Sequence, residues 1–194
     1  MTAQERASAL RVYLVAEGPC HVEFLAKLLP DARRAGAKFV DGKGKSSARS
    51  LARSLVAARH EPVALVLDAD TTEEHLVREQ RLITREFLRM ASPGVPTEVR
   101  LAVPSIEIVF FADRALLSRI VGVKVPDDEW ISGQFQPKKT LETLLSRAPV
   151  PSDYRQFLAR LNETDAARLA QHPFIREIQD FIEQATRSRV AETG

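Results

Sequence analysis

Cysteine occurs only once in the 194 residues, at Cys20, so the chain cannot form an internal disulfide. A sequence with so little cysteine is typical of a reducing compartment. Long apolar runs are also missing: the longest extend over about five residues, against the ~20 that a membrane-spanning helix needs. Residues 1–9 are polar and carry no signal-peptide pattern. The sequence therefore predicts a cytoplasmic protein that does not contact the membrane.

Aromatic residues are scarce as well, at 6% of the chain, and they are not interleaved with the basic side chains of residues 33–59 in the pattern typical of base stacking. This segment has eight Lys and Arg residues against a single Asp, a net charge of +7, which leaves −5 for the rest of the chain. Such a charge favours contact with phosphates. A solvated basic helix face explains the same charges equally well. The candidate nucleic-acid-binding residues are Lys43, Lys45, Arg49 and Arg53.

The sequence does contain two short apolar runs that each end abruptly in carboxylates. Residues 14–19 read Leu-Val-Ala-Glu-Gly-Pro, and residues 64–70 read Ala-Leu-Val-Leu-Asp-Ala-Asp. Each run has strand character and is followed by a helix-starting signal. In an open α/β sheet, ligands bind outside the carboxyl ends of the strands. Glu17, Asp68 and Asp70 are therefore predicted to meet there and to bind a hard divalent cation.

Strand-like and helix-like segments alternate up to about residue 120, which predicts a three-layer α/β sandwich with a mostly parallel sheet and helices on both faces. The expected strands are 11–16, 37–40, 63–67 and 99–103, and helices are expected to start near residues 19, 46, 72 and 105. The expected division is a frayed end over 1–10, an α/β core over 11–122, an irregular segment and C-terminal helices packed on the core over 123–187, and a tail over 188–194.

Local signals also predict where several helices begin. Ser46 or Ser47 is expected to cap the helix that follows the basic loop. Thr71 and Glu74 have the spacing of a capping box. Ser105 is expected to cap a single long apolar helix.

These residues resemble the motifs of the TOPRIM domain, a fold shared by topoisomerases, bacterial primases, small RNA-maturing nucleases and the overcoming-lysogenization-defect (OLD) nucleases. The resemblance covers residues 11–113 and is closest to stand-alone or OLD-type nucleases. The matching elements are Glu17-Gly18 after the first strand, Asp68-Ala69-Asp70 after a later strand, and Pro104-Ser105-Ile106-Glu107, which is similar to a Pro-x-x-Glu element of nuclease-type and phage-defence members.

The resemblance implies a metal-dependent nuclease. Asp68 and Asp70 would bind Mg²⁺ or Mn²⁺, and Glu17 would be a further ligand or the general acid/base. Glu107 would supply a second-site metal ligand, although it could instead complement the positive end of a helix. His21 departs from the family pattern, because nuclease-type members often have an acidic residue at that position. The departure favours an alternative, a non-catalytic TOPRIM-like binding or regulatory subunit.

A second enzyme class fits part of the sequence. The segment Asp68-Ala69-Asp70-Thr71-Thr72 is similar to the Asp-x-Asp-x-Thr signature of haloacid-dehalogenase-type phosphatases, in which Asp68 would be the nucleophile. That family usually places the motif on its first strand, and this interpretation leaves Glu17 without a role, so the phosphatase ranks below the nuclease.

The sequence also favours certain partners. It has no ATPase motif: Gly44-Lys45-Ser46 does not form a P-loop, because Phe39 stands where that motif needs glycine. By analogy with TOPRIM effectors, the expected partners are DNA or RNA and a separately encoded ATPase, in a phage-defence or repair system. A homo-oligomer is compatible with the sequence.

Overall fold

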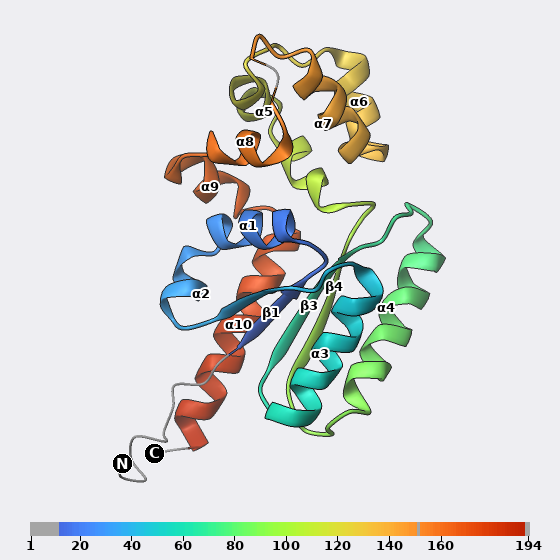
Figure 1. Ribbon diagram of the computed structural model, residues 1–194, viewed down its shortest axis with the longest axis vertical. Coiled ribbons are helices and arrows are strands. Elements are labelled where there is room, and N and C mark those ends of the chain that lie inside the picture. The colour runs from blue at the N-terminus through green and yellow to red at the C-terminus, as the bar shows by residue number, and fades with distance from the viewer. Residues whose placement is uncertain (1–11, 151, 193–194) are drawn as a thin grey trace.

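The computed structural model describes residues 12–150 and 152–192, so the predicted frayed segment 1–10 lies outside it. Within the described residues, four parallel strands form one sheet in the order β2-β1-β3-β4 (Figure 1). The strands are β1 (Tyr13–Ala16), β2 (Lys38–Asp41), β3 (Val63–Asp68) and β4 (Thr97–Ala102). The predicted α/β sandwich with a parallel sheet is confirmed.

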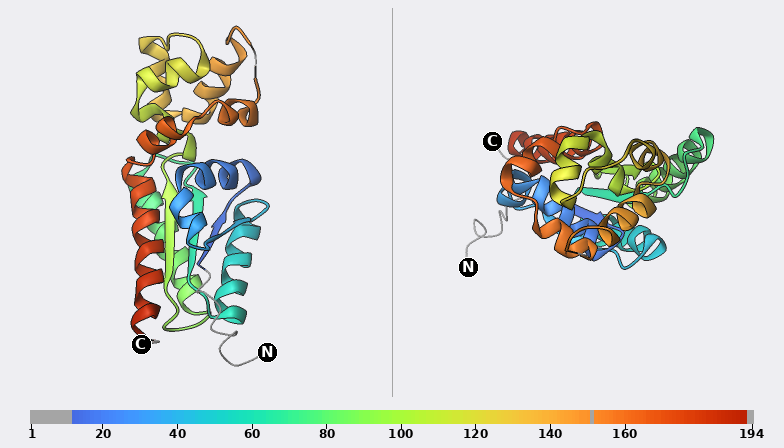
Figure 2. Two further views of the ribbon diagram at one scale, coloured as in Figure 1. Left: turned by 90° about the vertical axis from the view of Figure 1, so that its left-hand side faces the viewer. Right: turned by 90° about the horizontal axis from the view of Figure 1, so that it is seen from above.

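Helices cover both faces of the sheet (Figure 2). One face packs against α3 (Lys45–Arg59) and α4 (Glu74–Arg89). The other face packs against α1 (Pro19–Leu28), α2 (Pro30–Arg34) and α10 (Pro173–Glu192). Strands β1 and β3 are buried along their whole length, as expected of central parallel strands with covered faces.

The connections create a topological switch point between β1 and β3. From β1 the chain runs through α1 to β2 on one side, whereas β3 lies on the other side of β1. Helices α1 and α2, which connect β1 to β2, therefore lie on one face of the sheet. Helix α3, which connects β2 to β3, lies on the other face. At such a point the loops after two neighbouring strands diverge, and ligands of open α/β sheets bind in the crevice between them.

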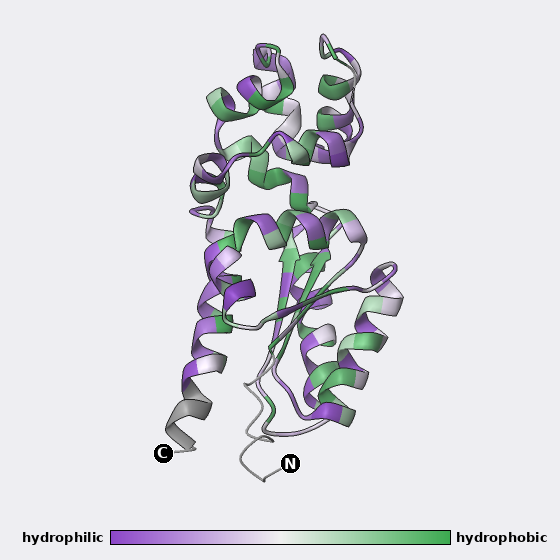
Figure 3. Cartoon of the chain, turned by 60° about the vertical axis from the view of Figure 1, so that its left-hand side comes forward, coloured by the Kyte–Doolittle hydropathy of each residue, from purple (hydrophilic) through white to green (hydrophobic). Residues whose placement is uncertain are grey.

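The chain after β4 continues beyond the carboxyl ends of the strands (Figures 1 and 2). The elements there are the 3₁₀-helix η2 (Ile106–Ala112), α5 (Arg114–Val121), α6 (Asp127–Phe135), α7 (Pro137–Ser146), α8 (Tyr154–Ala159) and α9 (Glu163–Leu169). Helix α10 then returns along the sheet and contacts β3 and β4. Over residues 173–187 its polar and apolar residues alternate (Figure 3), as in a helix with one buried side. No helix in the described part of the chain is long and apolar enough to cross a bilayer.

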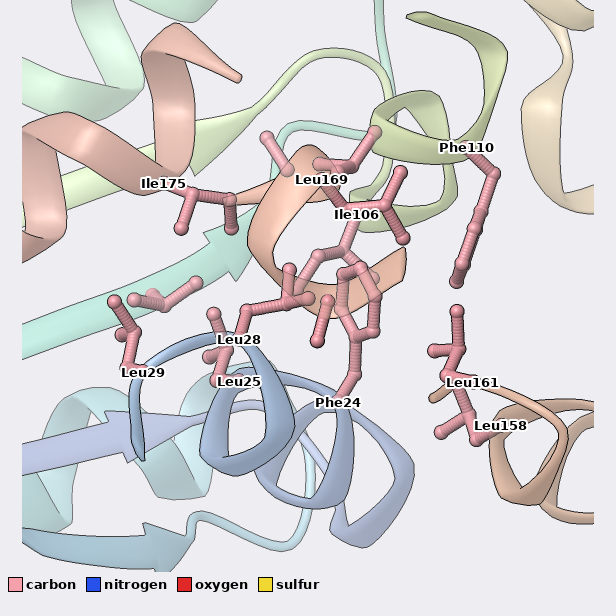
Figure 4. Close-up of a cluster of buried hydrophobic side chains, with 14 of the residues drawn as sticks. Phe24, Leu25, Leu28, Leu29, Ile106, Phe110, Leu158, Leu161, Leu169 and Ile175 are labelled. Carbon is pink, nitrogen blue, oxygen red and sulfur yellow. The ribbon is translucent and has the colours of Figure 1, made fainter. Parts of the chain in front are cut away.

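The larger hydrophobic core joins α1 to the helices beyond the sheet (Figure 4). Phe110 of η2 has its ring centroid 4.8 Å from that of Phe24 in α1 and 4.8 Å from that of Phe157 in α8. All three rings are fully buried. The sheet and the helices after β4 are therefore held together by one shared core.

Gly42 follows β2 at a point where the backbone has no room for a side chain. A Cβ atom there would lie 2.3 Å from the Cβ of Ala48 and 2.8 Å from the carbonyl oxygen of Ala16. We expect Gly42→Ala to lower the free energy of unfolding by about 1–3 kcal/mol, because overpacking displaces the start of α3. Urea denaturation checks this, with Gly18→Ala as the control, since a Cβ at Gly18 meets nothing within 4 Å. Equal stability of the two variants would contradict the prediction.

Helix α3 begins two or three residues earlier than the predicted caps imply. Its N-cap is Gly44, so neither Ser46 nor Ser47 caps it. Gly44 has a φ of +101°, which glycine adopts without a steric penalty. Its N–H donates a 2.6 Å hydrogen bond to the carbonyl oxygen of Glu17. A contact with the loop after β1 therefore fixes the start of this helix.

The capping box predicted from Thr71 and Glu74 is absent from α4. The Thr71 hydroxyl accepts a 3.1 Å hydrogen bond from the N–H of Glu73 and so forms a local turn before the helix. Glu73 is the N-cap, and its side chain makes no capping bond. Short-range bonds of this kind compete with helix caps for threonine.

The apolar segment after Ser105 is two helices instead of the single one predicted. Asp113 separates η2 from α5 and caps α5, because its carboxylate accepts a 2.9 Å hydrogen bond from the N–H of Leu116. Ser105 precedes η2 but makes no capping bond.

The irregular segment predicted to follow residue 122 contains the helix α6. Pro126 precedes this helix, and its first turn carries Asp127, Asp128 and Glu129. Carboxylates in the first turn stabilise a helix through its dipole. The apolar pattern alone therefore did not predict this helix.

Candidate metal and nucleic-acid site

The switch point brings Glu17 and Asp68 together. Ala16 at the end of β1 lies opposite Val66 of β3, so the residues that follow them emerge side by side. The N–H of Asp68 donates a 3.3 Å hydrogen bond to a carboxylate oxygen of Glu17. The two acidic motifs found in the sequence thus meet at the same edge of the sheet.

The element beginning at Pro104 completes the surroundings of Asp68. The Asp68 side chain is buried, with 6% of the residue exposed, and its Oδ1 accepts a 2.9 Å hydrogen bond from the N–H of Ile106. Glu107 is also buried, and its Oε2 accepts a 2.5 Å hydrogen bond from the hydroxyl of Ser105. Residues 104–107 therefore bring a backbone donor to Asp68 and a further carboxyl group close to it.

These surroundings disfavour the charged form of Asp68. Burial, followed by the negative charge of Glu107, raises its pKa from 3.8 to about 7, and Glu17 and Asp70 act in the same direction. Only the hydrogen bond from Ile106 favours the carboxylate. A buried carboxyl group among other carboxyl groups lacks a compensating positive charge.

His21 in α1 lies beside Asp68 and does not supply that charge. Its Nε2 is 3.7 Å from Oδ2 of Asp68. Burial lowers the pKa of His21 below its usual value of 6.5, although the negative charges of Glu107, Glu17 and Asp70 partly oppose this. The imidazole is therefore mainly neutral at pH 7. Its Nδ1 is shielded from solvent and has no hydrogen-bond partner among the described residues.

Asp70 has an uncommon backbone conformation and a partner of its own. It has a φ of +57°, an uncommon conformation for a residue other than glycine. Its carboxylate forms an ion pair with Lys45 at the start of α3. The side chain is 68% exposed, so the predicted meeting of all three motif carboxylates is only partly realised.

In this arrangement, the residues that the structure describes include no cluster of three or more His, Cys, Asp or Glu side chains that forms a metal-ligand set. Glu17 and Asp68 are linked by a hydrogen bond, Glu107 lies near them, and Asp70 is held by Lys45. Metal binding by these four residues remains a prediction.

The basic residues selected from the sequence lie along the start of α3 and the loop before it. Lys43 is exposed in that loop, and Lys45, Arg49 and Arg53 follow at four-residue spacing, which places the three on one side of the helix. Lys45 is engaged with Asp70. The guanidinium of Arg53 lies 4.6 Å from the centre of the Phe87 ring. Lys43 and Arg53 are exposed, whereas Lys45 and Arg49 are half-buried.

Sequence reasoning missed the residues that approach the site from the helices beyond the sheet. Lys138 in α7 contributes to the lowered pKa of His21. Tyr154 in α8 lies near Glu107, and burial, followed by the negative charge of Glu107, raises the pKa of its hydroxyl well above 10. No local motif marks either residue, because only the packing of α7 and α8 on α1 and η2 brings them here.

The fold is similar to that of two solved structures. The C-terminal region of the OLD protein from Xanthomonas campestris pv. campestris gives a TM-score of 0.58 at 12% sequence identity, over 94% of this chain and 98% of that chain. The C-terminal region of the Burkholderia pseudomallei OLD protein gives a TM-score of 0.58 at 14% identity, over 91% of this chain and 98% of that chain. No family model and no curated protein matches the sequence. The chain therefore shares the fold of the OLD C-terminal region, as its TOPRIM-like motifs predicted.

Proposed function

We propose that this protein cleaves phosphodiester bonds of nucleic acid with the help of Mg²⁺ or Mn²⁺ bound at Glu17 and Asp68. The observation that carries the proposal is the buried carboxyl group of Asp68, whose pKa is raised to about 7. The carboxyl groups around Asp68 repel its negative charge, and the mainly neutral His21 does not compensate for it. A divalent cation would compensate for it.

The donor chemistry of the site fits such a cation, because Mg²⁺ and Mn²⁺ prefer oxygen ligands. Asp68 and Glu17 would hold it, with Glu107 as a ligand at a second position. Asp70 would participate only when its ion pair with Lys45 opens. The chemistry that a divalent cation supplies is neutralisation of charge on a phosphoryl oxygen and activation of water. Glu17, if it is not a ligand, would accept the proton of the attacking water.

The basic residues would hold the nucleic-acid backbone next to these carboxyl groups. Lys43 and Arg49 lie on the segment that begins beside Glu17, since the N–H of Gly44 bonds to the Glu17 carbonyl oxygen. Phosphate contacts of this kind fix the position of a strand without reading its sequence. They also offset the repulsion between the phosphates and the carboxylate site.

The test is cleavage of end-labelled single-stranded DNA, RNA and supercoiled plasmid in Mg²⁺, in Mn²⁺ and in EDTA. We expect cleavage only with a divalent cation, and at least a hundredfold slower cleavage by Glu17→Gln, because this change removes a ligand or a proton acceptor. Glu86→Gln is the matched control, since Glu86 pairs with Arg89 on the surface of α4. Cleavage that persists in EDTA, or that Glu17→Gln retains in full, would overturn the proposal.

One observation favours a second function, a non-catalytic binding module. The described side chains form no three-ligand metal cluster, and His21 stands beside Asp68. Isothermal titration with Mn²⁺ separates the two functions. Absence of Mn²⁺ binding, together with nucleic-acid binding but no cleavage, would establish the module and exclude the nuclease.

The phosphatase alternative has less support. A nucleophilic aspartate must be ionised and must reach a phosphate. Asp68 is 6% exposed, and its pKa of about 7 leaves much of it protonated at neutral pH. Both properties weaken it as a nucleophile.

The similar structures are C-terminal regions of OLD proteins, so the same fold is there part of a larger protein. By analogy, we infer that the nuclease works with an ATPase in phage defence or repair. Co-purification of the tagged protein with an ATPase from its native host would support this inference.

A further inference from the structure

A cavity of about 630 Å³ opens beside the carboxylate site, between α1 and η2 on one side and α7 and α8 on the other. His21 and Glu107 belong both to its wall and to the surroundings of Asp68. Its volume lies in the range of roughly 300–1,000 Å³ typical of sites for small organic molecules. Neither the cleavage chemistry nor the basic residues of α3 account for it.

The walls of the cavity are largely apolar, with Leu141 and Leu145 of α7 among them. Three lining residues nevertheless bury a polar atom that has no hydrogen-bond partner among the described residues: Nδ1 of His21, Oγ of Ser152 and the hydroxyl oxygen of Tyr154. An unsatisfied buried group of this kind destabilises the folded protein. All three residues belong to the wall of one largely apolar cavity, which favours a ligand that is flat or apolar in its body and polar at its edges.

The hydroxyl of Tyr154 is held in a fixed position. Its ring centroid lies 6.4 Å from that of Phe110 and 6.1 Å from that of Phe157, so the ring is part of the aromatic packing between η2 and α8. Because its pKa is well above 10, the hydroxyl keeps its proton at neutral pH. It can therefore both donate and accept a hydrogen bond.

The charges around the cavity favour a neutral ligand body over an anion. Glu107, Glu142 and Asp153 line it against a single cation, Lys138. A phosphate would be repelled from most of the wall, whereas an uncharged heterocycle would not. A nucleobase has this chemistry: a planar apolar face and a rim of donors and acceptors.

On these grounds we propose that the cavity binds one unstacked nucleobase of the substrate strand, next to the phosphate that lies at Glu17 and Asp68. This inference rests on the proposed nuclease function and names its substrate class, a strand with an unpaired nucleotide. A base within a duplex cannot enter unless it is turned out of the stack, which costs the free energy of its stacking and pairing. The protein therefore prefers single strands and frayed ends to intact duplex.

The first test uses uncharged nucleosides, which need neither a metal nor cleavage. Saturation-transfer NMR with adenosine, guanosine, cytidine and thymidine in EDTA is expected to show binding by the wild type. Ser146→Trp, on the exposed rim of the cavity, should abolish it. Ser132→Trp is the matched control, because Ser132 is an exposed serine of α6 outside this cavity. Tyr154→Phe keeps the ring packing, and we expect it to weaken binding about five- to tenfold through the loss of one hydrogen bond.

The second test places the base in a strand. Labelled oligonucleotides with one abasic nucleotide at successive positions are compared by fluorescence anisotropy, with adenosine monophosphate as the free-nucleotide competitor. Loss of affinity when the abasic nucleotide stands at one particular position would support the proposal that the cavity binds a base of the strand. Displacement by the monophosphate with no abasic effect would instead assign the cavity to a free nucleotide and overturn the substrate role.

The two proposals fail in different ways. Nucleoside binding without cleavage would leave the cavity assignment standing and remove the nuclease. Metal-dependent cleavage with no nucleoside binding, and with equal rates for wild type and Ser146→Trp, would overturn the cavity assignment and keep the nuclease.

Discussion

The Asp68→Asn variant is expected to unfold less readily than the wild type in EDTA at pH 8. The pKa of Asp68 is about 7 in the folded protein, against 3.8 as its ordinary value. Between these two values the folded state binds more protons than the unfolded state, so the stability of the wild type falls as pH rises from about 4 to about 7. Asparagine does not titrate there, and its side-chain oxygen can still accept the hydrogen bond from Ile106.

The expected stability difference between Asp68→Asn and the wild type is small at pH 4, grows to at most roughly 4 kcal/mol near pH 7, and is constant above it. Urea denaturation in EDTA at several pH values measures it. Mn²⁺ at pH 8 should then stabilise the wild type and leave Asp68→Asn unchanged. The same variant should cleave nucleic acid on the order of 10³-fold more slowly, because it lacks a charged metal ligand. A stability difference that does not change with pH would contradict the assigned pKa.

The Phe110→Ala variant is expected to lose about 3–5 kcal/mol of stability. Phe110 is fully buried and packs on Phe24 and Phe157, so its removal leaves a cavity between α1, η2 and α8. For a domain of this size the loss lowers the melting temperature by roughly 6–20 °C. Thermal and urea denaturation measure both quantities.

A matched control for Phe110→Ala is Phe135→Ala, because Phe135 is 63% exposed and its truncation should change stability by no more than about 0.5 kcal/mol. If Phe110→Ala does not fold, Phe110→Leu supplies the measurement, with an expected loss of about 1–2 kcal/mol. Equal effects at positions 110 and 135 would show that the shared core does not hold the two parts of the molecule together.

The sheet and the positions of Glu17 and Asp68 could be predicted from the sequence because both depend on local patterns. Short apolar runs mark the strands, and the rule for the carboxyl ends of parallel strands then places the residues that follow. Asp70 follows the same run as Asp68, yet its left-handed backbone directs it to Lys45. The N–H of Asp70 donates a 2.8 Å hydrogen bond to the carbonyl oxygen of Pro104, a long-range contact that no spacing in the sequence describes.

The cavity could not be predicted in this way. Its wall combines residues of α1 and η2 with residues of α7 and the segment that leads into α8, and the packing of these elements on one another fixes their relative positions. The predicted starts of α3 and α4 were wrong for a related reason. Contacts of single residues such as Gly44 and Thr71 outweigh the average preference of serine and threonine for helix caps.

Helix α10 has a consequence for the synthesis of the protein. It contacts β3, β4 and α2, and all of these leave the ribosome well before residues 173–192 do. Until then, the face of the sheet that α1 and α2 cover lacks its third helix, and part of its apolar surface is open to other chains. Exposed surfaces of this kind promote aggregation during synthesis. Chains truncated before α10 should therefore be insoluble, and full-length chains should depend on chaperones until translation ends.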